Sequence, residues 1–354
     1  MKHYDFSNIE KIYVVGDLMG EFTELIFRLN DGFKEKIDDT ILHPKEIEKR
    51  KIKEKLSDRD NYLIHKPIFG SFDGMVSFEN TNFIYSDALI ISNGDNHIGF
   101  NEDSFYEKTF IKINEILAKN NTTLLLVRGN NDDPSFFSEE KINFSNVKTI
   151  PDYSVILTKM GNLLCVGGGI SNDRIWRQKQ EKRLSTISPD KKKRLYWENE
   201  RACFNEDEMK AISDSKLKIS GVISHMPPTF VTTDLSRLKT NWCINDPNLI
   251  KDIEKSRLVM DKIYTNLNEQ NNHILFWFFS HYKHDNYTER NNVLFKSNPP
   301  FAVLSIYSEF QKYQFEKERK KQTIRSKKCN PISNRNEAME NFFMDMVFVD
   351  VANH

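Results

Sequence analysis

The sequence predicts an α/β fold, and three observations support this prediction. Short apolar runs rich in β-branched residues recur along the chain, and most end in Gly, Asp, Asn, Ser or His. Amphipathic stretches lie between several of these runs. The chain has 354 residues, of which 38% are apolar, so it can bury a sizeable core. Strands that alternate with helices favour a sheet whose strand ends carry the functional residues.

Seven runs have the length and composition of strands. In chain order they are residues 12–15, 88–92, 123–127, 163–166, 221–224, 273–279 and 302–307. Three stretches repeat apolar residues at the spacing of one helix face, and they are predicted as helices. They are residues 22–29, 104–118 and 247–267.

Two segments differ in composition from the rest of the chain. Residues 34–60 are dense in charge of both signs, and we interpret them as a solvated insertion. From Glu309 onward the chain is polar and carries a basic run, which we interpret as a solvated helix or tail. The sequence thus predicts a domain over residues 1–308 with a charged insertion at about 34–60, followed by a basic, polar C-terminal extension over 309–354.

Charge and cysteine content argue against several classes of protein. Lys and Arg together number 51, as do Asp and Glu, so no net basic field attracts a nucleic acid or a membrane. A nucleic-acid partner is conceivable through the basic run, but the net charge does not support it. No run approaches the roughly 18 apolar residues of a membrane-spanning helix, and the first residues lack the apolar segment of a signal peptide. The four cysteines form no C-x-x-C pair, which excludes a zinc ribbon and favours a cytoplasmic protein of unspecified oligomeric state.

Residues with metal-ligand chemistry follow five of the predicted strands. They are Asp17, Asp95, Asn130, His225 and His281. A single Gly-Asp after a strand is common in turns, and a single histidine at a strand end is usually structural. Two aspartates, one asparagine and two histidines at successive strand ends form a rarer pattern. If these strands lie side by side, their ends face one crevice in which oxygen and imidazole ligands can converge.

This ordered series resembles the calcineurin-like metallophosphoesterase superfamily. The family pattern is GDxHG, GD, GNH(D/E), a lone His and GHxH. Here it reads GDLMG at 16–20, GD at 94–95, GNND at 129–132, HMPP at 225–228 and SHYKH at 280–284. The resemblance covers residues 11 to about 307, and GGGISNDR at 167–174 is similar to a Gly-Gly segment of these proteins. It implies a four-layer α/β/β/α sandwich with two mixed β-sheets.

The resemblance also implies a metal-dependent phosphoesterase. In this family two divalent cations, such as Mn, Fe or Zn ions, share a bridging carboxylate and activate a water that hydrolyses phosphate mono- or diesters. By resemblance, Asp95 is the bridging carboxylate, and Asn130, His225 and His281 complete one metal site. All four residues are present. A phosphorylated substrate is the expected partner.

The other metal site departs from the family pattern. Asp17 matches, but Met19 stands where the family has a histidine, and a thioether is a poor ligand for Mn²⁺ or Fe. The last ligand would be the second histidine of GHxH. Lys283 occupies that position and His284 follows it, so either a one-residue bulge brings His284 to the metal or the Lys283 ammonium replaces the metal's charge. The sequence predicts one complete metal site and leaves the occupancy of this one open.

Two positions after Asn130 are implied as catalytic. Asn131 stands at the family's GNH histidine, and an amide can donate a hydrogen bond but cannot supply a proton. Loss of general-acid assistance typically costs about 10²–10⁴ in rate. Asp132 would normally orient that histidine, and here we expect it to hold Asn131 or a water. His97, two residues after Asp95, is a candidate to replace the missing imidazole.

Arginines near these motifs are candidates for substrate binding. A guanidinium can bind phosphate oxygens through paired hydrogen bonds. Arg128 directly precedes the GNND motif, and Arg174 ends the glycine-rich segment. For Arg128 the alternative is a side chain that points outward at the end of its strand.

The departures at Met19 and Asn131 leave a second interpretation open. The chain is then a degenerate phosphoesterase-fold protein with an incomplete first metal site, serving as a binding or regulatory module. A third interpretation, nucleic-acid processing, depends on the basic run alone. It ranks below the other two because the rest of the chain is balanced in charge.

Overall fold

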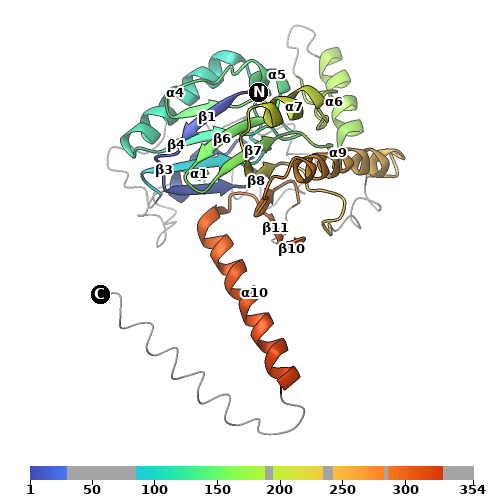
Figure 1. Cartoon of the computed structure of the whole chain (residues 1–354). Coiled ribbons are helices and arrows are strands. Elements are labelled where there is room, and N and C mark those ends of the chain that lie inside the picture. Colours follow the sequence, from blue (N-terminus) through green and yellow to red (C-terminus); the bar gives the residue numbers. More distant parts are fainter. Residues whose placement is uncertain (30–84, 188–193, 234–241, 283–285, 330–354) are drawn as a thin grey trace, which may run out of the picture. The chain divides into compact units, whose positions relative to one another are not determined.

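The computed structural model describes residues 1–29, 85–187, 194–233, 242–282 and 286–329 (Figure 1). The chain divides into two compact units, Met1–Tyr307 and Ser308–His354. The predicted insertion at 34–60, together with Lys283 and His284, lies outside the described residues. None of the helices in the described ranges is long and apolar enough to cross a membrane.

Five strands form one sheet, in the order β12-β2-β3-β4-β5. Their bounds are Lys11–Val15 (β2), Ala88–Ser92 (β3), Thr123–Leu126 (β4), Val147–Thr149 (β5) and Val303–Ser305 (β12). Strands β2 to β5 run parallel, and β12 is an antiparallel edge strand beside β2. The carboxyl ends of β2, β3 and β4 therefore meet at one edge of this sheet.

Seven strands form the other sheet, in the order β1-β6-β7-β8-β9-β11-β10. Their bounds are His3–Phe6 (β1), Ser154–Thr158 (β6), Asn162–Val166 (β7), Ile219–Ser224 (β8), Phe276–Phe279 (β9), Tyr287–Arg290 (β10) and Val293–Ser297 (β11). Strands β7, β8, β9 and β11 run parallel, whereas β6 is antiparallel to β7 and β10 is antiparallel to β11. Both sheets are mixed, and β8 and β9 end side by side.

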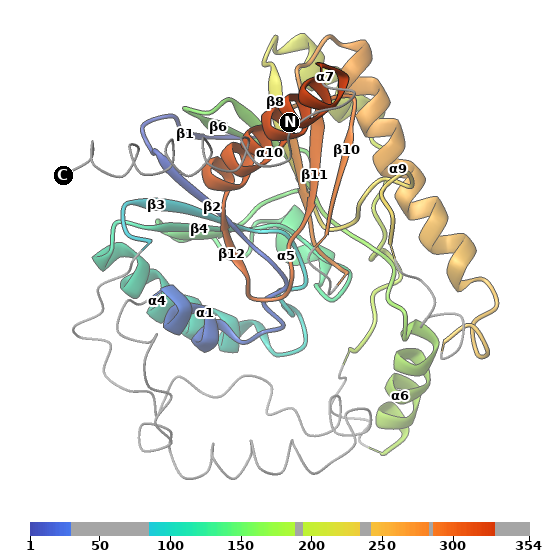
Figure 2. The same ribbon diagram turned by 90° about the horizontal axis from the view of Figure 1, so that it is seen from below.

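Helices pack against each sheet. On the five-stranded sheet lie α1 (Phe22–Leu29), α4 (Asp103–Lys119) and α5 (Pro134–Ser138). On the seven-stranded sheet lie α7 (Glu206–Asp214) and α9 (Leu249–Glu269). Figure 2 shows α1 and α4 together below β2 and β3, where the rings of Phe22 and Phe110 have centroids 4.9 Å apart. The other described helices are α6 (Arg174–Ile187) and α10 (Ile306–Cys329).

The central strands are buried on both of their faces, so each sheet packs against helices on one face and against the other sheet on the opposite face. In β3, Ile90 lies in the core shared with α4, whereas Leu89 and Ile91 point to the opposite face and are also buried. In β8, Val222 lies in the core shared with α9, and Ile223 is buried on the other face. The predicted four-layer α/β/β/α sandwich of two mixed sheets is therefore confirmed.

Candidate metal centre

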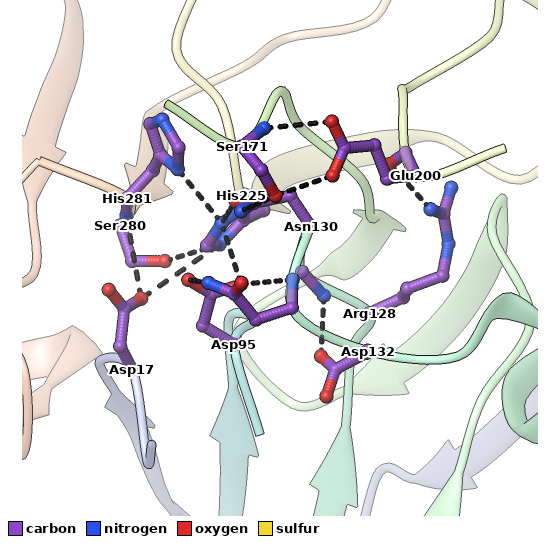
Figure 3. A network of polar contacts seen from close by, with 12 residues as sticks. Asp17, Asp95, Arg128, Asn130, Asp132, Ser171, Glu200, His225, Ser280 and His281 are labelled. Atoms are coloured by element: carbon purple, nitrogen blue, oxygen red, sulfur yellow. Dashed lines mark hydrogen bonds and ion pairs between the residues drawn. The ribbon is translucent and has the colours of Figure 1, made fainter. Parts of the chain in front are cut away.

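Five polar side chains from different strand ends meet in the described structure (Figure 3). They are Asp17 after β2, Asp95 after β3, Asn130 after β4, His225 after β8 and His281 after β9. The first four are buried, with exposed fractions of 0% for His225, 2% for Asp17 and 3% for Asp95 and Asn130. The fold thus brings together five of the six residues that the resemblance implies as metal ligands, and the sixth, His284, lies outside the described residues.

His225 is at the centre of this group. Its Nε2 lies 2.8 Å from Asn130 Oδ1, 3.3 Å from Asp95 Oδ1 and 3.2 Å from His281 Nδ1. Ligand atoms of Asp95, His225 and His281 all lie within 4.8 Å of one another. One carboxylate oxygen, one amide oxygen and two imidazole nitrogens form a donor set suited to Mn, Fe or Zn. The residues present therefore fit one divalent cation.

Polar partners lie at both ring nitrogens of His225, and those at Nδ1 suit a proton there when Nε2 binds a cation. The carbonyl oxygen of Asn93 can only accept, and it lies 3.1 Å from Nδ1. The hydroxyl of Ser280 donates to the same carbonyl and lies 2.9 Å from Nδ1. With the proton on Nδ1, Nε2 presents its lone pair to the other ligands, as a metal-binding histidine must.

The two aspartates of the site have opposite pKa shifts. Burial and the neighbouring Asp95 raise the pKa of Asp17 to about 7. Burial would also raise the pKa of Asp95, but electrostatic interactions with the imidazoles of His225, His97 and His281 outweigh it and lower the pKa. Desolvation and the charge of His225 lower the pKa of His281 to about 3, so this imidazole is neutral at physiological pH. A divalent cation between the carboxylates would allow both to ionise.

The backbone at the site adopts conformations that most residues avoid. Asp95, His97 and His281 have φ angles of 48°, 60° and 66°, in the left-handed region. Such residues cost on the order of 1–3 kcal/mol each and concentrate at functional sites. Gly94 has a φ of +122°, and a Cβ there would lie 2.1 Å from His225 Nδ1. The sequence needs glycine at this position because the imidazole occupies the space.

The first metal site is only partly described. Asp17 Oδ1 lies 3.9 Å from His225 Nδ1, and its carboxylate accepts a long hydrogen bond of 3.4 Å from the backbone N–H of His281. Met19 lies beside Asp95, because its backbone N–H donates to the Asp95 carbonyl at 2.8 Å. Lys283 and His284 fall outside the described residues, so the choice between them stays a prediction.

Asn131 and Asp132 play different parts in the site. Asn131 donates two hydrogen bonds to the carboxylate of Asp95, from its backbone N–H to Oδ1 at 2.8 Å and from Nδ2 to Oδ2 at 2.6 Å. The buried Asp132 accepts hydrogen bonds from the backbone N–H groups of Asn96, Ile98 and Gly129. Burial and the charge of Asp95 raise the pKa of Asp132 to about 6. Asp132 was expected to hold Asn131 or a water; its described contacts instead hold the loops after β3 and β4 together, because those backbone N–H groups converge on it.

Both arginines expected to bind substrate take part in internal ion pairs. Arg128 Nη2 lies 2.7 Å from Asp152 Oδ2, and its Nη1 donates to the carbonyl of Glu200 at 2.7 Å. Arg174 contacts Asp246 through two nitrogens and Asp252 through Nη2 at 2.8 Å. A phosphate would have to compete with these carboxylates, so substrate binding by Arg128 and Arg174 stays a prediction that the described contacts do not favour.

Three residues of the site were not singled out from the sequence. Ser171 and Ser280 lie within the motif segments, but nothing in the pattern shows that their hydroxyls contact metal-ligand side chains. Glu200 carries no sequence signal, since it is one acidic residue in a polar stretch. It is buried, with 1% of its surface exposed, and burial raises its pKa to about 7. Only the fold shows that Glu200 belongs to the site.

Comparisons with known proteins agree with this arrangement at the level of family. A family model described as calcineurin-like phosphoesterase matches residues 64–285. No curated protein matches the chain in sequence.

Several solved structures are similar to the chain. They include GAP50, the anchor in the inner membrane complex of Plasmodium (10% identity, 82% of this chain and 71% of that chain covered, TM-score 0.30). Phosphopantetheinyl hydrolase from Mycobacterium tuberculosis is 9% identical, with coverage of 82% and 90% and a TM-score of 0.30. Cold-active protein-tyrosine phosphatase of a psychrophilic Shewanella species is 11% identical, with coverage of 83% and 72% and a TM-score of 0.29.

Proposed function

Because the chain belongs to the calcineurin-like phosphoesterase family, we propose that it is a metal-dependent phosphoesterase that hydrolyses phosphate mono- or diesters. The observation that carries this proposal is the convergence of Asp95, Asn130, His225 and His281 from the ends of four strands. A divalent cation held there would lower the pKa of a water molecule and offset the charge of the phosphoryl oxygens.

The residues around the cation site suggest which substrates are hydrolysed fastest. Asn131 has a second N–H on Nδ2 besides the one that bonds Asp95, and that group can donate to a phosphoryl oxygen. An amide cannot protonate a leaving group. We therefore expect esters whose leaving group departs as a stable anion, such as aryl phosphates, to react faster than alkyl phosphates.

Metal content and hydrolysis test the proposal together. We expect purified protein to bind one to two equivalents of Mn²⁺ and to hydrolyse an activated aryl phosphate when Mn²⁺ is added. Asp95→Asn should abolish hydrolysis and weaken Mn²⁺ binding, because it removes the charged carboxylate of the donor set. Asp214→Asn, the same chemical change at an exposed residue of α7, is the matched control. An Asp95→Asn protein that keeps both Mn²⁺ and activity contradicts the proposal.

A specific observation favours a second candidate function. Met19 occupies the position of a metal ligand in the first site, which suits a binding or regulatory module with one cation or none. Met19→His separates the two candidates, and the left-handed backbone there (φ 51°) is one that histidine tolerates. If Met19→His binds one more Mn²⁺ equivalent and hydrolyses substrate much faster, the first metal site of the natural chain is incomplete. If neither changes, Met19 is accommodated in a site that works as it stands.

The remaining assignments are finer proposals. Manganese as the physiological ion is supported by the mixed oxygen and nitrogen donors. A cytoplasmic location is supported by the free thiols of Cys165, Cys203 and Cys243. A nucleic-acid substrate depends on the basic run alone, and its signature would be oligonucleotide binding that weakens steeply with salt.

A further inference from the structure

A chain of hydrogen bonds leads from the metal ligand Asn130 to the buried carboxylate of Glu200 (Figure 3). Asn130 Nδ2 donates to Ser171 Oγ at 2.9 Å. Ser171 Oγ donates to Glu200 Oε2 at 2.5 Å, and the backbone N–H of Ser171 donates to Oε1 at 2.8 Å. Ser171 and Glu200 each expose 1% of their surface, so solvent does not replace these partners.

The backbone of Glu200 is fixed at both of its polar groups. Its carbonyl accepts from Arg128 Nη1 at 2.7 Å and from the backbone N–H of Gly169 at 3.0 Å. Its N–H donates to the carbonyl of Trp197 at 3.1 Å. Arg128, which the sequence suggested for substrate binding, therefore helps to hold the segment that carries the carboxylate.

The chemistry of these hydrogen bonds determines which end of the Asn130 amide faces the cation site. The Ser171 hydroxyl donates to Glu200, and at pH 8 the ionised carboxylate can only accept. The hydroxyl oxygen then accepts an N–H from Asn130, and the amide oxygen points the other way, 2.8 Å from His225 Nε2. This direction matters because the amide oxygen can bind a cation, whereas the amide nitrogen has no free lone pair.

We infer that Glu200 and Ser171 are positioning residues that fix the orientation of the Asn130 amide and so keep its oxygen directed at the cation. The inference rests on the proposed function, because it requires a cation at Asp95, Asn130, His225 and His281. It assigns a role to two residues that do not touch the metal or the substrate.

Glu200→Gln tests the inference because it keeps the shape of the side chain and reverses the hydrogen-bond chain. The new amide oxygen accepts from the Ser171 N–H, and the new NH₂ donates to the Ser171 hydroxyl. That hydroxyl is then free to donate to Asn130, which turns its NH₂ toward the cation. We expect the affinity for Mn²⁺, measured by calorimetric titration at pH 8, to fall about 10- to 100-fold. Glu198→Gln, the same change at an exposed residue of the same segment, should leave it unchanged.

Asn130→Asp distinguishes positioning from a general structural role. An aspartate presents an oxygen in either orientation, so the direction of the hydrogen bonds from residue 130 to Glu200 no longer matters. In an Asn130→Asp background, Glu200→Gln should not reduce Mn²⁺ affinity. An equal loss in both backgrounds overturns the inference, because that is the result of damage to the fold. Thermal melting of the metal-free proteins checks folding independently of the cation.

Ser171→Ala is the second variant should Glu200→Gln fail to fold. It removes the link between Glu200 and Asn130, and we again expect weaker Mn²⁺ binding with Asn130 but not with Asp at that position. Wild-type protein that binds no Mn²⁺ overturns the proposed function and this inference with it. Wild-type protein that binds Mn²⁺, with Glu200→Gln binding it equally well, overturns this inference alone.

Discussion

At the scale of single residues, the site depends on how closely the strand-end loops approach one another. Gly94 shows this, since a Cβ there would lie 2.1 Å from Nδ1 of His225. The Gly-Asp and Gly-Asn pairs in the sequence are therefore more than turn signals. They let the carboxylate of Asp95 and the amide of Asn130 reach an imidazole that comes from the other sheet.

Gly94→Ala is expected to weaken the metal centre. The added methyl group displaces His225, and the positive φ adds strain, so the free energy of unfolding should fall by about 1–3 kcal/mol. Mn²⁺ affinity should fall as well. Gly161→Ala is the matched control, because it has a positive φ (+110°) and a close neighbour, Ser220 Oγ at 2.3 Å, but lies in the β6–β7 hairpin. Urea unfolding and calorimetric titration should show destabilisation in both variants and loss of Mn²⁺ binding only in Gly94→Ala.

The raised pKa of Asp17 predicts a pH dependence of the stability of the metal-free protein. The unfolded chain loses this proton near the ordinary pKa of 3.8, whereas the folded protein keeps it up to a pH of about 7. Between these values the folded state binds more protons, so the contribution of Asp17 to stability is full below the lower value and is lost as the pH rises to about 7. Asp17→Asn removes this dependence.

We therefore expect metal-free Asp17→Asn protein to gain stability relative to wild type as the pH rises from about 4 to about 7. Urea unfolding in the presence of a chelator at several pH values measures the difference. Asp214→Asn should show no such trend, because its carboxylate is exposed. A constant difference between Asp17→Asn and wild type across this range would contradict the assignment.

At the scale of elements, the apolar runs identified the central strands well. Strand β3 has the predicted bounds, and β2, β4, β7 and β8 differ from them by one or two residues. These strands are buried on both faces, so their composition is apolar throughout. Five of the described strands were not predicted. Strands β1, β5 and β10 are short and lie at sheet edges, and β1 and β10 expose alternate or most residues. The inner strands β6 and β11 were missed as well.

Two predicted strands are shorter in the structure, because pairing with neighbouring elements and not the apolar pattern sets their ends. The strand predicted at 302–307 is limited to Val303–Ser305, because its last two residues begin helix α10. The strand predicted at 273–279 begins only at Phe276, where pairing with β8 and β11 starts. Helix α1 has the predicted bounds, since its apolar face and its sequence pattern coincide.

Helix α9 has a function in the site that its pattern does not reveal. Its buried Arg257 donates to the carbonyls of Pro228, Thr229 and Val231 at 2.6, 3.0 and 2.5 Å. These residues form the loop that follows His225, so one side chain of α9 fixes the loop that carries a candidate metal ligand. All three contacts come from Nη2, and Nη1 donates to Thr233 Oγ1 at 2.9 Å, so one planar guanidinium holds several groups of this loop.

Arg257→Lys should lower the free energy of unfolding by about 2 kcal/mol or more, because buried carbonyls lose charged donors. Urea unfolding measures the change. Arg183→Lys at an exposed position of α6 should change stability little. Equal effects of the two substitutions would show that Arg257 does not stabilise the loop.

At the scale of the whole molecule, the chain comprises two compact units, and all described candidate metal ligands lie in the first, Met1–Tyr307. We predict that protein ending after residue 308 retains Mn²⁺ affinity and aryl phosphate hydrolysis. Calorimetric titration and an activity assay on the shortened and full-length proteins test this. Loss of Mn²⁺ binding in the shortened protein would place part of the site in the extension, and loss of oligonucleotide binding alone would favour a role of the basic run with nucleic acids.

The sequence by itself determined the α/β class, the central strands and the order of five metal-type residues at strand ends. It could do so because these features are local: burial on both faces makes a strand apolar, and a ligand at a strand end directly follows that strand. The family resemblance extended this to the four-layer sandwich and to the expected metal chemistry.

The tertiary structure decided how these residues contact one another. It directed Arg128 and Arg174 into ion pairs with carboxylates that are 24, 72 and 78 positions away in sequence. It also placed Glu200 behind Asn130, which no pattern could indicate because an isolated buried acid has no periodicity. The direction of a side chain depends on partners distant in sequence, and those partners meet only when the chain folds.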